Sequence, residues 1–523
     1  MTDATGAWRE VAAFLATPEA YGLPDPVQVI DTSISRVFLA GAHAYKIKKP
    51  VKLGFLDFST VALRHEDCER EIVLNRRTAP SIYLGIIAIT READGNLALA
   101  GKGTAVEWAV KMRRFDNVML LDQMAVDGTL TNELIARLAR NIAAFHTAIP
   151  PEYEAGGVEI FRRTLLGNDR EYRNFSGDIF PPATINALRD ASLAALDAHA
   201  PLMNARKAAG WVRHCHGDLH LGNIFCLNGE PTPFDCIEFS DVIARIDILY
   251  DLAFLLMDLW RRGLGALANH CLNQYVAHLA PDGAEACIEG LSLLPLFLSC
   301  RAGIRAFVAA RTSLSQPENK QLISQAHNFF TLAHDFLRPA PPRLIAISGF
   351  SGSGKSVLAR ALAPAIGAAP GALILRSDEI RKQLAGAPLL EQLPQSAYTP
   401  ENSAKVYACI LKRAQMALQA GHSVIADAVY ARDTERAAIE TVAHALGVPF
   451  QGLWLDAPPE ILASRVGARS GDASDATADI VQAQLEYDTG GIGWGRIDAS
   501  GSPDETQRAA LTALQLEPDG KVH

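Results

Sequence analysis

Hydrophobic and polar positions follow different patterns in successive parts of the chain. Between Val27 and Ile47 they alternate, which is typical of strands with one buried face. From about Thr131 onward the pattern is strongly helical, interrupted by an irregular Gly-, Asp- and Asn-rich segment near 215–241. This order predicts an α+β region in which a small strand-rich part precedes a large helical part.

A third pattern begins after Arg338–Arg343, where three prolines in four residues cannot lie inside a helix. We place a domain boundary there. Beyond it, short apolar runs alternate with long Ala-rich helical patterns, which predicts an α/β domain with a parallel sheet flanked by helices. The runs are Leu344–Ser348, Leu373–Leu375, Ser423–Ala426 and Phe450–Leu455.

Composition and charge narrow the classes of protein that fit. The chain has 523 residues, of which 49% are hydrophobic and 20% are charged, and this suits two or more packed domains. Its 49 Lys+Arg and 58 Asp+Glu give a formal net charge of -9. That balance argues against a mainly electrostatic grip on nucleic acid or on an anionic membrane.

Cysteine spacing and apolar runs bear on the cellular location. The eight cysteines form no CxxC pair and no Cys/His spacing of a zinc site, so we expect reduced thiols. Charged residues interrupt Met1–Ala13, which does not fit a signal peptide. The most apolar stretch, Gly290–Cys300, is 11 residues long against the roughly 20 that a membrane-spanning helix needs. We therefore expect a cytoplasmic protein in which this stretch is a buried helix or helix pair.

The most specific signal lies in the C-terminal part and fits G-x-x-x-x-G-K-[ST] in full. It follows a predicted strand and opens a helix, so that backbone N–H groups and the helix N-terminus can surround phosphates. Lys355 would reach the β- and γ-phosphates of a nucleotide, and Ser356 would be a ligand of Mg²⁺. The motif consists of Gly349, Phe350, Ser351, Gly352, Ser353, Gly354, Lys355 and Ser356.

Two further strands of this part end in an aspartate. Asp378 follows the run at 373–375, with Arg381 about one helical turn beyond it, and it could accept a proton from an acceptor hydroxyl. Asp427 ends the run at 423–426 and is placed to hold Mg²⁺ directly or through water. The alternative for each aspartate is a helix N-cap.

Downstream arginines could clamp a transferring phosphoryl group. Alternatively, these arginines are solvated residues on the surfaces of helices. Ser470–Thr477 then fits a flexible lid tip. The four arginines are Arg432, Arg436, Arg465 and Arg469, the last two spaced i, i+4.

Residues 343–520 resemble the small P-loop kinases of the gluconate-kinase, polynucleotide-kinase and zeta-toxin type, often classed as AAA_33-like ATP-binding domains. The resemblance implies that Asp378 is the acceptor-activating base and that Arg381 contacts acceptor or phosphate. It also makes Arg465 and Arg469 lid residues, and 497–501 the last strand and the loop near adenine.

The N-terminal part carries a second phosphoryl-transfer constellation in His216–Asn223 and Pro233–Phe239. Such chemistry uses an Asp beside the acceptor hydroxyl, an Asn that holds Mg²⁺ and a further Asp for the metals that bridge the phosphates. Asp218, Asn223 and Asp235 supply these groups, and the five-residue step from Asp218 to Asn223 equals that of protein-kinase catalytic loops. The DFG motif is replaced, which indicates a kinase-like fold other than a protein kinase proper.

Residues 30 to about 310 resemble the aminoglycoside phosphotransferase family, whose loop reads close to H-G-D-x-H-x-x-N. The resemblance implies a bilobal, protein-kinase-like fold, with a small lobe at about 25–115 and a helical lobe at about 116–338. It also implies a strand lysine on the nucleotide phosphates, oriented by a helix glutamate. We favour Lys46 over Lys48 and Glu71 over Glu69, and we interpret Lys48 and Lys49 as a solvated strand end.

Supporting roles are expected for other residues of this part. By the resemblance, Ser33 and Ser35 lie in a loop over the phosphates, and Val106–Met112 enters the hinge where backbone groups meet adenine. Asp247 and Asp251 fit structural supports of the catalytic loop, and His216 fits an orienting hydrogen bond rather than a zinc ligand. Three arginines could receive an anionic acceptor, although salt bridges at the edge of the core are the alternative: Arg301, Arg305 and Arg311.

The combined arrangement resembles bacterial fusions of an aminoglycoside phosphotransferase-like domain, residues 1–338, with an AAA_33-like kinase domain, residues 343–520. We expect two sites that use ATP and Mg²⁺ to phosphorylate a hydroxyl of a small molecule such as a sugar, sugar acid or amino sugar. In one alternative, one domain is a nucleotide-gated regulatory module for the other. In another, the C-terminal domain is a polynucleotide 5′-kinase or a zeta-toxin-like nucleotide-sugar kinase, and the low basic content of 380–400 argues against a nucleic-acid partner.

Overall fold

The computed structural model describes residues 4–53, 56–468 and 471–516, which form two compact units. The first unit contains the chain up to Leu130 together with Ala148–Gly156 and Val212–Asp251. The second contains Thr131–Thr147, Gly157–Trp211 and all described residues from Leu252 onward. The predicted seam at 338–343 lies inside the second unit, in non-helical chain that separates a helical part from a parallel sheet.

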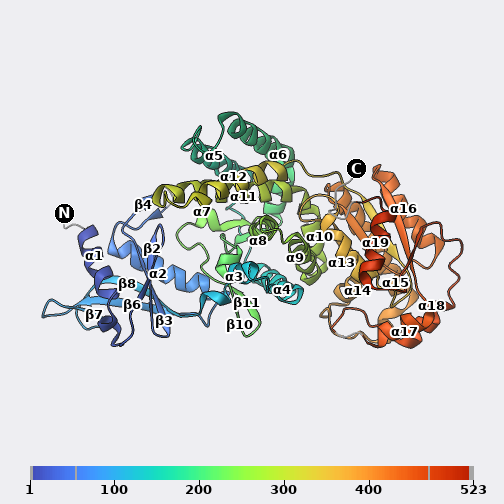
Figure 1. Cartoon of the computed structure of the whole chain (residues 1–523), viewed down its shortest axis with the longest axis horizontal. Helices are drawn as coiled ribbons and strands as arrows, with labels where there is room; N and C mark the ends of the chain where they lie inside the picture. The colour runs from blue at the N-terminus through green and yellow to red at the C-terminus, as the bar shows by residue number, and fades with distance from the viewer. Residues whose placement is uncertain (1–3, 54–55, 469–470, 517–523) are drawn as a thin grey trace. The chain divides into compact units, whose positions relative to one another are not determined.

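The first unit is built on a six-stranded antiparallel sheet (Figure 1). In spatial order its strands are β1 (Gln28–Asp31), β2 (Ser35–Ala40), β3 (His43–Lys48), β8 (Thr104–Arg113), β6 (Tyr83–Arg91) and β7 (Leu97–Leu99). One face packs on α1 (Ala4–Leu15), and the other packs on α2 (Val61–Asn75). Side chains of β3 therefore alternate between the two cores, and Lys46 and Lys48 share the α2 face with Ala44.

The irregular segment that the sequence places near 215–241 lies in the first unit between short elements. These are β4 (Lys52–Leu53), β5 (Leu56–Asp57), α3 (Leu121–Val126), β9 (Val212–His214), β10 (Ile224–Leu227), β11 (Glu230–Pro233), α7 (Asp241–Ala244) and β12 (Arg245–Asp247). β10 and β11 form a hairpin, and β12 pairs antiparallel with β9. The loop 215–223 and the segment after β11 lie next to each other. A hydrogen bond joins them, in which the backbone N–H of Ile237 donates to the carbonyl of His216 at 2.9 Å.

Long helices make up the first part of the second unit, and α8 enters it from the first unit. They are α4 (Asn132–Ala148), α5 (Val158–Arg173), α6 (Pro182–Ala208), α8 (Ile248–Arg261), α9 (Gly265–His278), α10 (Pro281–Gly290), α11 (Leu294–Ser315) and α12 (Lys320–Phe336). Among the described residues, one helical stretch, Pro281–Ser315, is long and apolar enough to cross a membrane, and 72% of its most apolar window is buried inside the protein. It contains the apolar run Gly290–Cys300, which is a buried helix pair as predicted.

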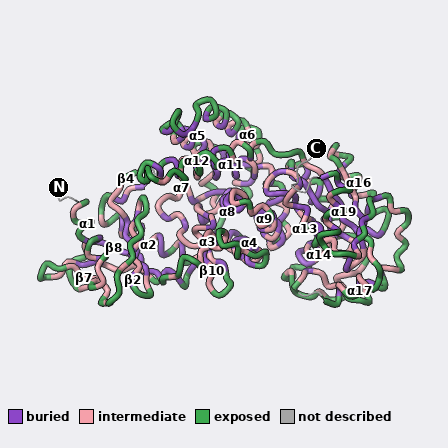
Figure 2. The backbone as a smooth tube through the Cα atoms, viewed as in Figure 1, coloured by how far each residue is buried: buried purple, intermediate pink, exposed green. Residues whose placement is uncertain are grey.

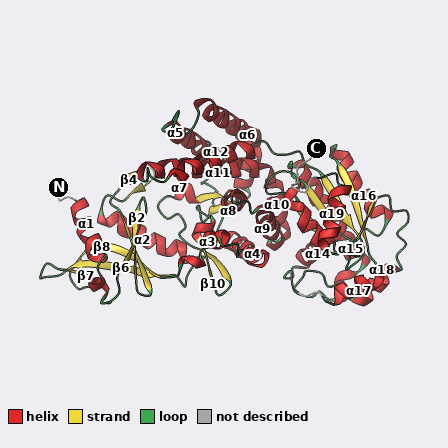
Figure 3. Cartoon of the chain, in the orientation of Figure 1, coloured by secondary structure: helices red, strands yellow, loops and turns green. Residues whose placement is uncertain are grey.

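A five-stranded parallel sheet forms the rest of the second unit (Figure 3). Its order is β14 (Leu373–Arg376), β15 (Val424–Asp427), β13 (Leu344–Ser348), β16 (Phe450–Asp456) and β17 (Gly495–Asp498). Its helices are α13 (Lys355–Leu362), α14 (Ser377–Ala385), α15 (Pro400–Gln419), α16 (Asp433–Leu446), α17 (Pro459–Gly467), α18 (Ala478–Leu485) and α19 (Pro503–Ala513). α13 and α19 cover one face, and α15 and α16 cover the other.

This sheet confirms the predicted α/β domain, since the four apolar runs are β13, β14, β15 and β16. All five residues of β13 are buried, as a central strand covered on both faces requires. Figure 2 shows buried stretches of the chain close to α13, the helix that follows this strand. The chain crosses to the other side of β13 after β15, so the carboxyl ends of β13 and its neighbours flank a switch point where ligands of such sheets bind.

Candidate active sites

Lys46 lies at the centre of the first site. Its Nζ is 3.0 Å from Glu71 Oε1 on α2 and 2.6 Å from Asp235 Oδ1. Burial acts to lower the pKa of Lys46, but the carboxylates of Asp235 and Glu71 outweigh it and hold that pKa well above its usual value. The expected pair of a strand lysine and the helix glutamate Glu71 is present, and the charged ammonium also contacts Asp235.

Lys48 is buried beside it, so the expectation of a solvated strand end is wrong for this residue. Its side chain is 0% exposed, and its Nζ contacts Asp67 at 2.9 Å, Glu71 at 2.5 Å and Glu238. The alternation of the strand explains the error, because Lys48 shares a face with Lys46 and that face is covered by α2. Lys49 points elsewhere and pairs with Asp31 at 2.8 Å.

The charges of this buried cluster perturb one another. Three carboxylates share the ammonium of Lys48. Burial of Glu238 raises its pKa to about 7. Burial also acts to raise the pKa of Glu71, but two lysines outweigh it and lower that pKa to about 2. Glu71 is therefore a carboxylate at neutral pH and the common partner of Lys46 and Lys48.

The catalytic loop brings Asp218 and Asn223 together. Asn223 Nδ2 donates to Asp218 Oδ2 at 2.8 Å and to its carbonyl at 3.0 Å, and His220 Nε2 lies 3.4 Å from the same carboxylate. The five-residue step predicted from the sequence thus closes into a tight loop. Because Asn223 uses its amide nitrogen here, its amide oxygen is the atom suited to a cation.

Asp235 is held in an unusual backbone conformation next to this loop. Its φ is 57°, in the left-handed region that is rare outside glycine and that clusters at functional sites. Backbone N–H groups of the segment are held by side chains of the sheet lobe, since Asp235 N donates to Tyr83 Oη at 3.1 Å and Cys236 N donates to Asn75 Oδ1 at 2.9 Å. The carboxylate is consequently directed at Lys46.

Supports of the loop match the roles expected from the sequence. Asp251 accepts hydrogen bonds from the backbone N–H groups of His216 and Gly217 at 3.1 and 2.8 Å. The buried His216 ring donates from Nε2 to the carbonyl of Phe234 at 2.9 Å, and burial lowers its pKa. Asp247 accepts from the backbone N–H of Leu249 at 2.8 Å. These contacts support the backbone of the loop, as expected for His216, Asp247 and Asp251.

The loop between β1 and β2 forms a tight hairpin. Ser35 is buried and its Oγ has no hydrogen-bond partner, whereas Ser33 is exposed. A donor role of either hydroxyl toward phosphate stays a prediction.

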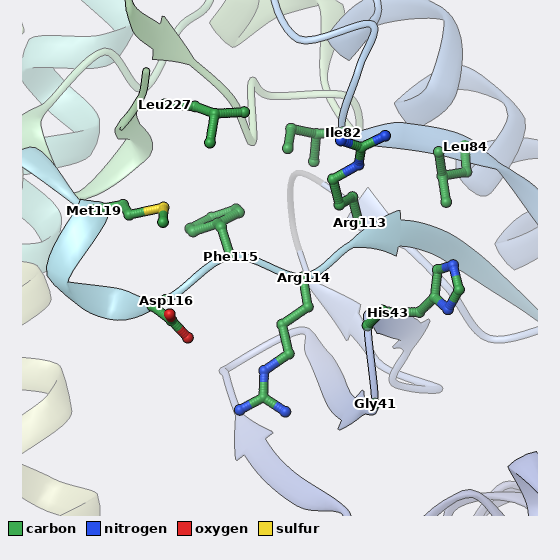
Figure 4. Close-up of a pocket in the computed structure, with 11 residues that line it drawn as sticks. Gly41, His43, Ile82, Leu84, Arg113, Arg114, Phe115, Asp116, Met119 and Leu227 are labelled. Atoms are coloured by element: carbon green, nitrogen blue, oxygen red, sulfur yellow. The ribbon is translucent and has the colours of Figure 1, made fainter. Parts of the chain in front are cut away.

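A cavity of about 710 Å³ lies where β8 ends and the predicted hinge begins (Figure 4). Arg113, Arg114 and Phe115 contribute to its wall, together with His43 at the start of β3. Phe115 also stacks on Phe225 with ring centroids 4.9 Å apart. The cavity therefore has an apolar wall and borders β3, the strand on which Lys46 lies three residues after His43.

In the second unit the phosphate-binding motif connects β13 to α13. Gly349, Gly352 and Gly354 have φ values of 134°, 86° and 92°, and α13 begins at Lys355. A Cβ on Gly352 would lie 2.4 Å from the carbonyl oxygen of Leu462, so this turn admits only glycine there. Lys355 Nζ donates to the carbonyl of Phe350 at 3.0 Å, and Ser351 N donates to Gln484 Oε1 of α18 at 2.7 Å.

Asp427, at the end of β15, fits a cation site beside this motif. It is 2% exposed, its Oδ2 is buried without a hydrogen-bond partner, and burial raises its pKa. The Ser356 hydroxyl bonds to it, and Lys355 lies close enough to stabilise its charge. A carboxylate and a hydroxyl oxygen are ligands that Mg²⁺ accepts. The N-cap alternative is excluded, because the next helix, α16, is capped by Arg432.

Arg376 contacts the acidic groups of the second site, a role that was not predicted. Its guanidinium bonds to Asp472, at 3.1 Å for one of the two contacts, and lies 3.8 Å from Asp378, Glu379 and Asp427. Burial acts to lower its pKa, but Asp378 and Glu379 outweigh this and raise it. Strand β14 ends at this residue, one position before the predicted acceptor element.

Asp378 and Arg381 lie on the first turns of α14. Asp378 is not an N-cap, since that position is taken by Arg376, and its side chain is 31% exposed. Arg381 donates to the carbonyl of Ala397 at 2.9 Å, and its guanidinium stacks 4.7 Å from the centre of the Tyr398 ring. Both side chains thus reach the open edge of the sheet, where their predicted roles toward an acceptor stay predictions.

The predicted phosphoryl clamp is not assembled. Arg465 donates to the carbonyls of Ala499 and Gly501, both at 2.7 Å, so it holds the loop after β17. Arg436 is buried and donates to the carbonyls of Tyr430 and Ala431 at 2.9 and 2.8 Å.

The predicted clamp includes two further arginines. Arg432 is exposed at the start of α16, and Arg469 lies outside the described residues. Ser470 of the predicted lid tip lies outside the described residues, and Asp475 within it contacts Lys382 at 3.0 Å and accepts from Tyr398 Oη at 2.6 Å.

Among the arginines of α11, Arg311 matches the alternative of a salt bridge, whereas Arg301 and Arg305 contact aromatic rings. Arg301 is buried against the ring of Phe254, Arg305 stacks near Phe329, and Arg311 pairs with Glu171. Two site residues were not predicted: Lys48, two positions after Lys46 on β3, and Arg376, which ends β14 two positions before Asp378. Their positions on these strands are the property that could have identified them.

Comparison with known proteins places both parts in families. A model described as "Phosphotransferase enzyme family" matches residues 119–286, and one described as "AAA domain" matches residues 344–488. An adenylyl-sulfate kinase of Myxococcus xanthus is 29% identical over 119 residues, which is 23% of this chain and 60% of that protein. The crystal structure of a choline/ethanolamine kinase family protein from Mesorhizobium loti is 15% identical, with a TM-score of 0.39 over 63% of this chain and 95% of that one.

One relative extends along both parts. The uncharacterized protein Rv2004c of Mycobacterium tuberculosis is 31% identical over 493 residues, which cover 91% of this chain and 93% of that protein. The resemblance to a fusion of two kinase-type domains is confirmed. The chain therefore belongs to the same family as this mycobacterial protein, and it is an ATP-dependent phosphotransferase in which an aminoglycoside phosphotransferase-like domain precedes a P-loop kinase domain.

Proposed function

We propose that the chain is a bifunctional cytoplasmic kinase, in which each domain transfers the γ-phosphoryl group of ATP to a hydroxyl of a small molecule. The observation that carries the proposal is the presence of two separate pairs of a lysine and a neighbouring carboxylate, each next to a loop of the kind that binds phosphate in kinases. One pair is Lys46 with Asp235, and the other is Lys355 with Asp427. The eight cysteines, all among the described residues, form no disulfide, which supports a reducing compartment.

In the first domain, Lys46 would bind the phosphates while Glu71 keeps its ammonium in place. Asn223 and Asp235 would hold Mg²⁺, which supplies charge neutralisation between the phosphates when it is bound. Asp218 would accept the proton of the acceptor hydroxyl, since its carboxylate is oriented by Asn223 and is 37% exposed. The cavity at the end of β8 would take the nucleotide base.

In the second domain, the backbone N–H groups of Gly349–Ser356 and the ammonium of Lys355 would surround the β- and γ-phosphates. Ser356 and Asp427 would hold Mg²⁺. Asp378 would act as the base toward the acceptor, and Arg381 would bind it. A sugar, sugar acid or amino sugar fits this arrangement, because carboxylates suit hydroxyl groups and the guanidinium of Arg381 suits an anionic substituent.

A library assay tests the proposal. The full chain is incubated with labelled ATP, Mg²⁺ and a panel of sugars, sugar acids and amino sugars, and phosphorylated products are identified by mass spectrometry. Asp218→Ala should abolish one activity and Asp378→Ala the other, each leaving its counterpart intact. Absence of phosphorylated product from the whole panel, or loss of both activities with one substitution, would contradict it.

The alternative of a regulatory second domain gives a different result in the same assay. If that domain only gates the first, Asp378→Ala removes no product of its own. A 5′-hydroxyl oligonucleotide in the panel tests polynucleotide kinase activity, which the proposal expects to be absent.

A further inference from the structure

The edge strand of the P-loop sheet is completed by side chains of the phosphotransferase domain. β14 has a strand neighbour on one side only, β15, which leaves backbone groups on its other edge without a ladder partner. Asn273 of α9 supplies that partner. Its Oδ1 accepts from the N–H of Ile374 at 2.7 Å, and its Nδ2 donates to the carbonyl of Ala372 at 3.2 Å.

A second amide one helical turn earlier reinforces this contact. Asn269 Nδ2 donates to the same carbonyl of Ala372 at 2.9 Å, and its Oδ1 accepts from Asn273 Nδ2 at 3.1 Å. The two side chains are 2% and 8% exposed. Two buried amides thus take the place of a sixth strand at the position where a neighbouring peptide group would lie.

A contact in the opposite direction involves the helix that follows β14. Gln383 of α14 is 8% exposed, and its Nε2 donates to the carbonyls of Val276, Ala277 and Leu279 at 2.9, 2.9 and 3.1 Å. These carbonyls belong to the C-terminal end of α9, where backbone acceptors lack partners within the helix. Arg413 of α15 donates to Gln383 Oε1 at 2.6 Å and fixes the amide in this orientation.

These contacts hold the strand–helix unit that carries the acceptor residues. Ile374 lies two positions before Arg376, and Asp378 and Arg381 lie on α14 between the two contact points of α9. An amide buried without its partner costs free energy, so the contacts hold β14 and α14 at one distance from α9. The Walker A motif is on β13 and α13 and has none of these contacts among the described residues.

We infer that Asn269 and Asn273 of the phosphotransferase domain are positioning residues for phosphoryl transfer in the P-loop domain, acting through β14 and α14 on Asp378. The inference rests on the proposed function of the second site. It makes the helical lobe a structural part of that site, so the P-loop kinase depends on the domain that precedes it. Nucleotide binding at Lys355 does not share this dependence.

The test compares Asn273→Leu with Lys412→Ala in the full chain. Leucine keeps the size of the side chain and removes both hydrogen bonds. Lys412 pairs with Glu285 in the same contact region, but it is 60% exposed, so its loss should matter little. Hydrogen exchange at Ile374 should accelerate by roughly tenfold or more in Asn273→Leu, the factor expected for one lost hydrogen bond, and should be unchanged in Lys412→Ala.

Activity is measured as ATP hydrolysis with water as acceptor in an Asp218→Ala background, which confines turnover to the second site. Asn273→Leu should lower kcat by roughly tenfold and leave KM for ATP unchanged, because positioning of Asp378 affects transfer and not nucleotide binding. Asn269→Leu removes one bond and should shift both readouts in the same direction by less, so it serves if the first variant does not fold.

Unchanged exchange at Ile374 in both leucine variants would overturn the inference. Increased exchange with an unchanged kcat would also overturn it, because the contact would then be structural alone. If the parent chain hydrolyses no ATP and transfers no phosphate, the proposed function fails. If exchange at Ile374 still accelerates in the leucine variants in that case, the contact between α9 and β14 is established but has no role in catalysis.

Discussion

At the scale of single residues, the cluster around Lys48 is the least replaceable group of the first unit. One buried ammonium contacts Asp67, Glu71 and Glu238, which come from α2 and from the segment after Asp235. An uncompensated buried charge costs more than the pair itself contributes. Lys48 therefore fixes both α2 and the segment after Asp235 relative to β3, even though Lys46 is the lysine placed at Asp235.

Replacement of Lys48 should destabilise the protein strongly. Lys48→Met leaves three neighbouring carboxylates without their shared cation, and the loss should be about 3–5 kcal/mol. Calorimetric scans would detect it as a lowered Tm. The double variant Lys48→Met/Glu238→Gln should recover part of the loss, because one of the uncompensated charges is gone. A Tm of Lys48→Met equal to that of the parent chain would contradict this account of the cluster.

Glu238 should make stability depend on pH near neutrality. Its pKa is about 7 in the fold against 4.5 for an ordinary glutamate, so the folded state binds the extra proton. A group of this kind stabilises the fold below its unfolded pKa and loses that contribution as pH rises through the folded pKa. Between pH 6 and pH 8 the loss should be about 1 kcal/mol.

The measurement compares the parent chain with Glu238→Gln in calorimetric scans at pH 6 and pH 8. Taking the difference in stability between the two proteins removes the contribution of all other titrating groups. The parent should lose more stability than the variant over this interval. Equal losses would show that Glu238 does not titrate there.

At the scale of elements, the turn between β13 and α13 depends on two glycines for different reasons. Gly352 and Gly354 both have positive φ, near 90°. A Cβ on Gly352 would meet the backbone of Leu462, whereas a Cβ on Gly354 meets nothing within 4 Å. Gly354→Ala should cost about 1–2 kcal/mol from backbone strain alone.

Gly352→Ala should cost more than Gly354→Ala, since the carbonyl of Leu462 has to move with α17. Chemical denaturation of the two variants in the absence of nucleotide measures this difference without interference from phosphate binding. If the two alanine variants were equally stable, the close approach of α17 to the turn would not restrict residue 352.

The elements also show which features can be predicted from the sequence alone. The apolar runs predicted β13–β16, because strands buried on both faces are continuous in hydrophobicity, and the Walker A spacing placed Lys355 at a helix start. Arg465 could not be placed in the same way. Its spacing from Arg469 fits a clamp, but the carbonyls of Ala499 and Gly501 that it binds are more than 30 residues away along the chain. Contacts between distant segments decide such side chains, and periodicity carries no information about them.

At the scale of the whole molecule, the sequence predicted a boundary between domains, and the contacts reveal a dependence across it. The prolines at 339–342 do separate the helical part from the parallel sheet. However, Asn273 and Gln383 connect α9 with β14 and α14 across that seam, and isolated polar residues on helices give no sign of such a partner. The two lysines proposed to bind phosphate nevertheless lie in separate units, Lys46 in the first and Lys355 in the second.

This separation predicts the stoichiometry of nucleotide binding. The full chain should bind two equivalents of a non-hydrolysable ATP analogue in the presence of Mg²⁺. Lys46→Met and Lys355→Met should each bind one equivalent, because each removes the cation of one phosphate site while the other set of residues is untouched. The double variant should bind none. Isothermal titration calorimetry measures all four proteins, with Lys412→Ala as a surface control that should bind two. One equivalent in the parent chain would show that only one domain is a nucleotide site, and the single variant that abolishes binding would identify which.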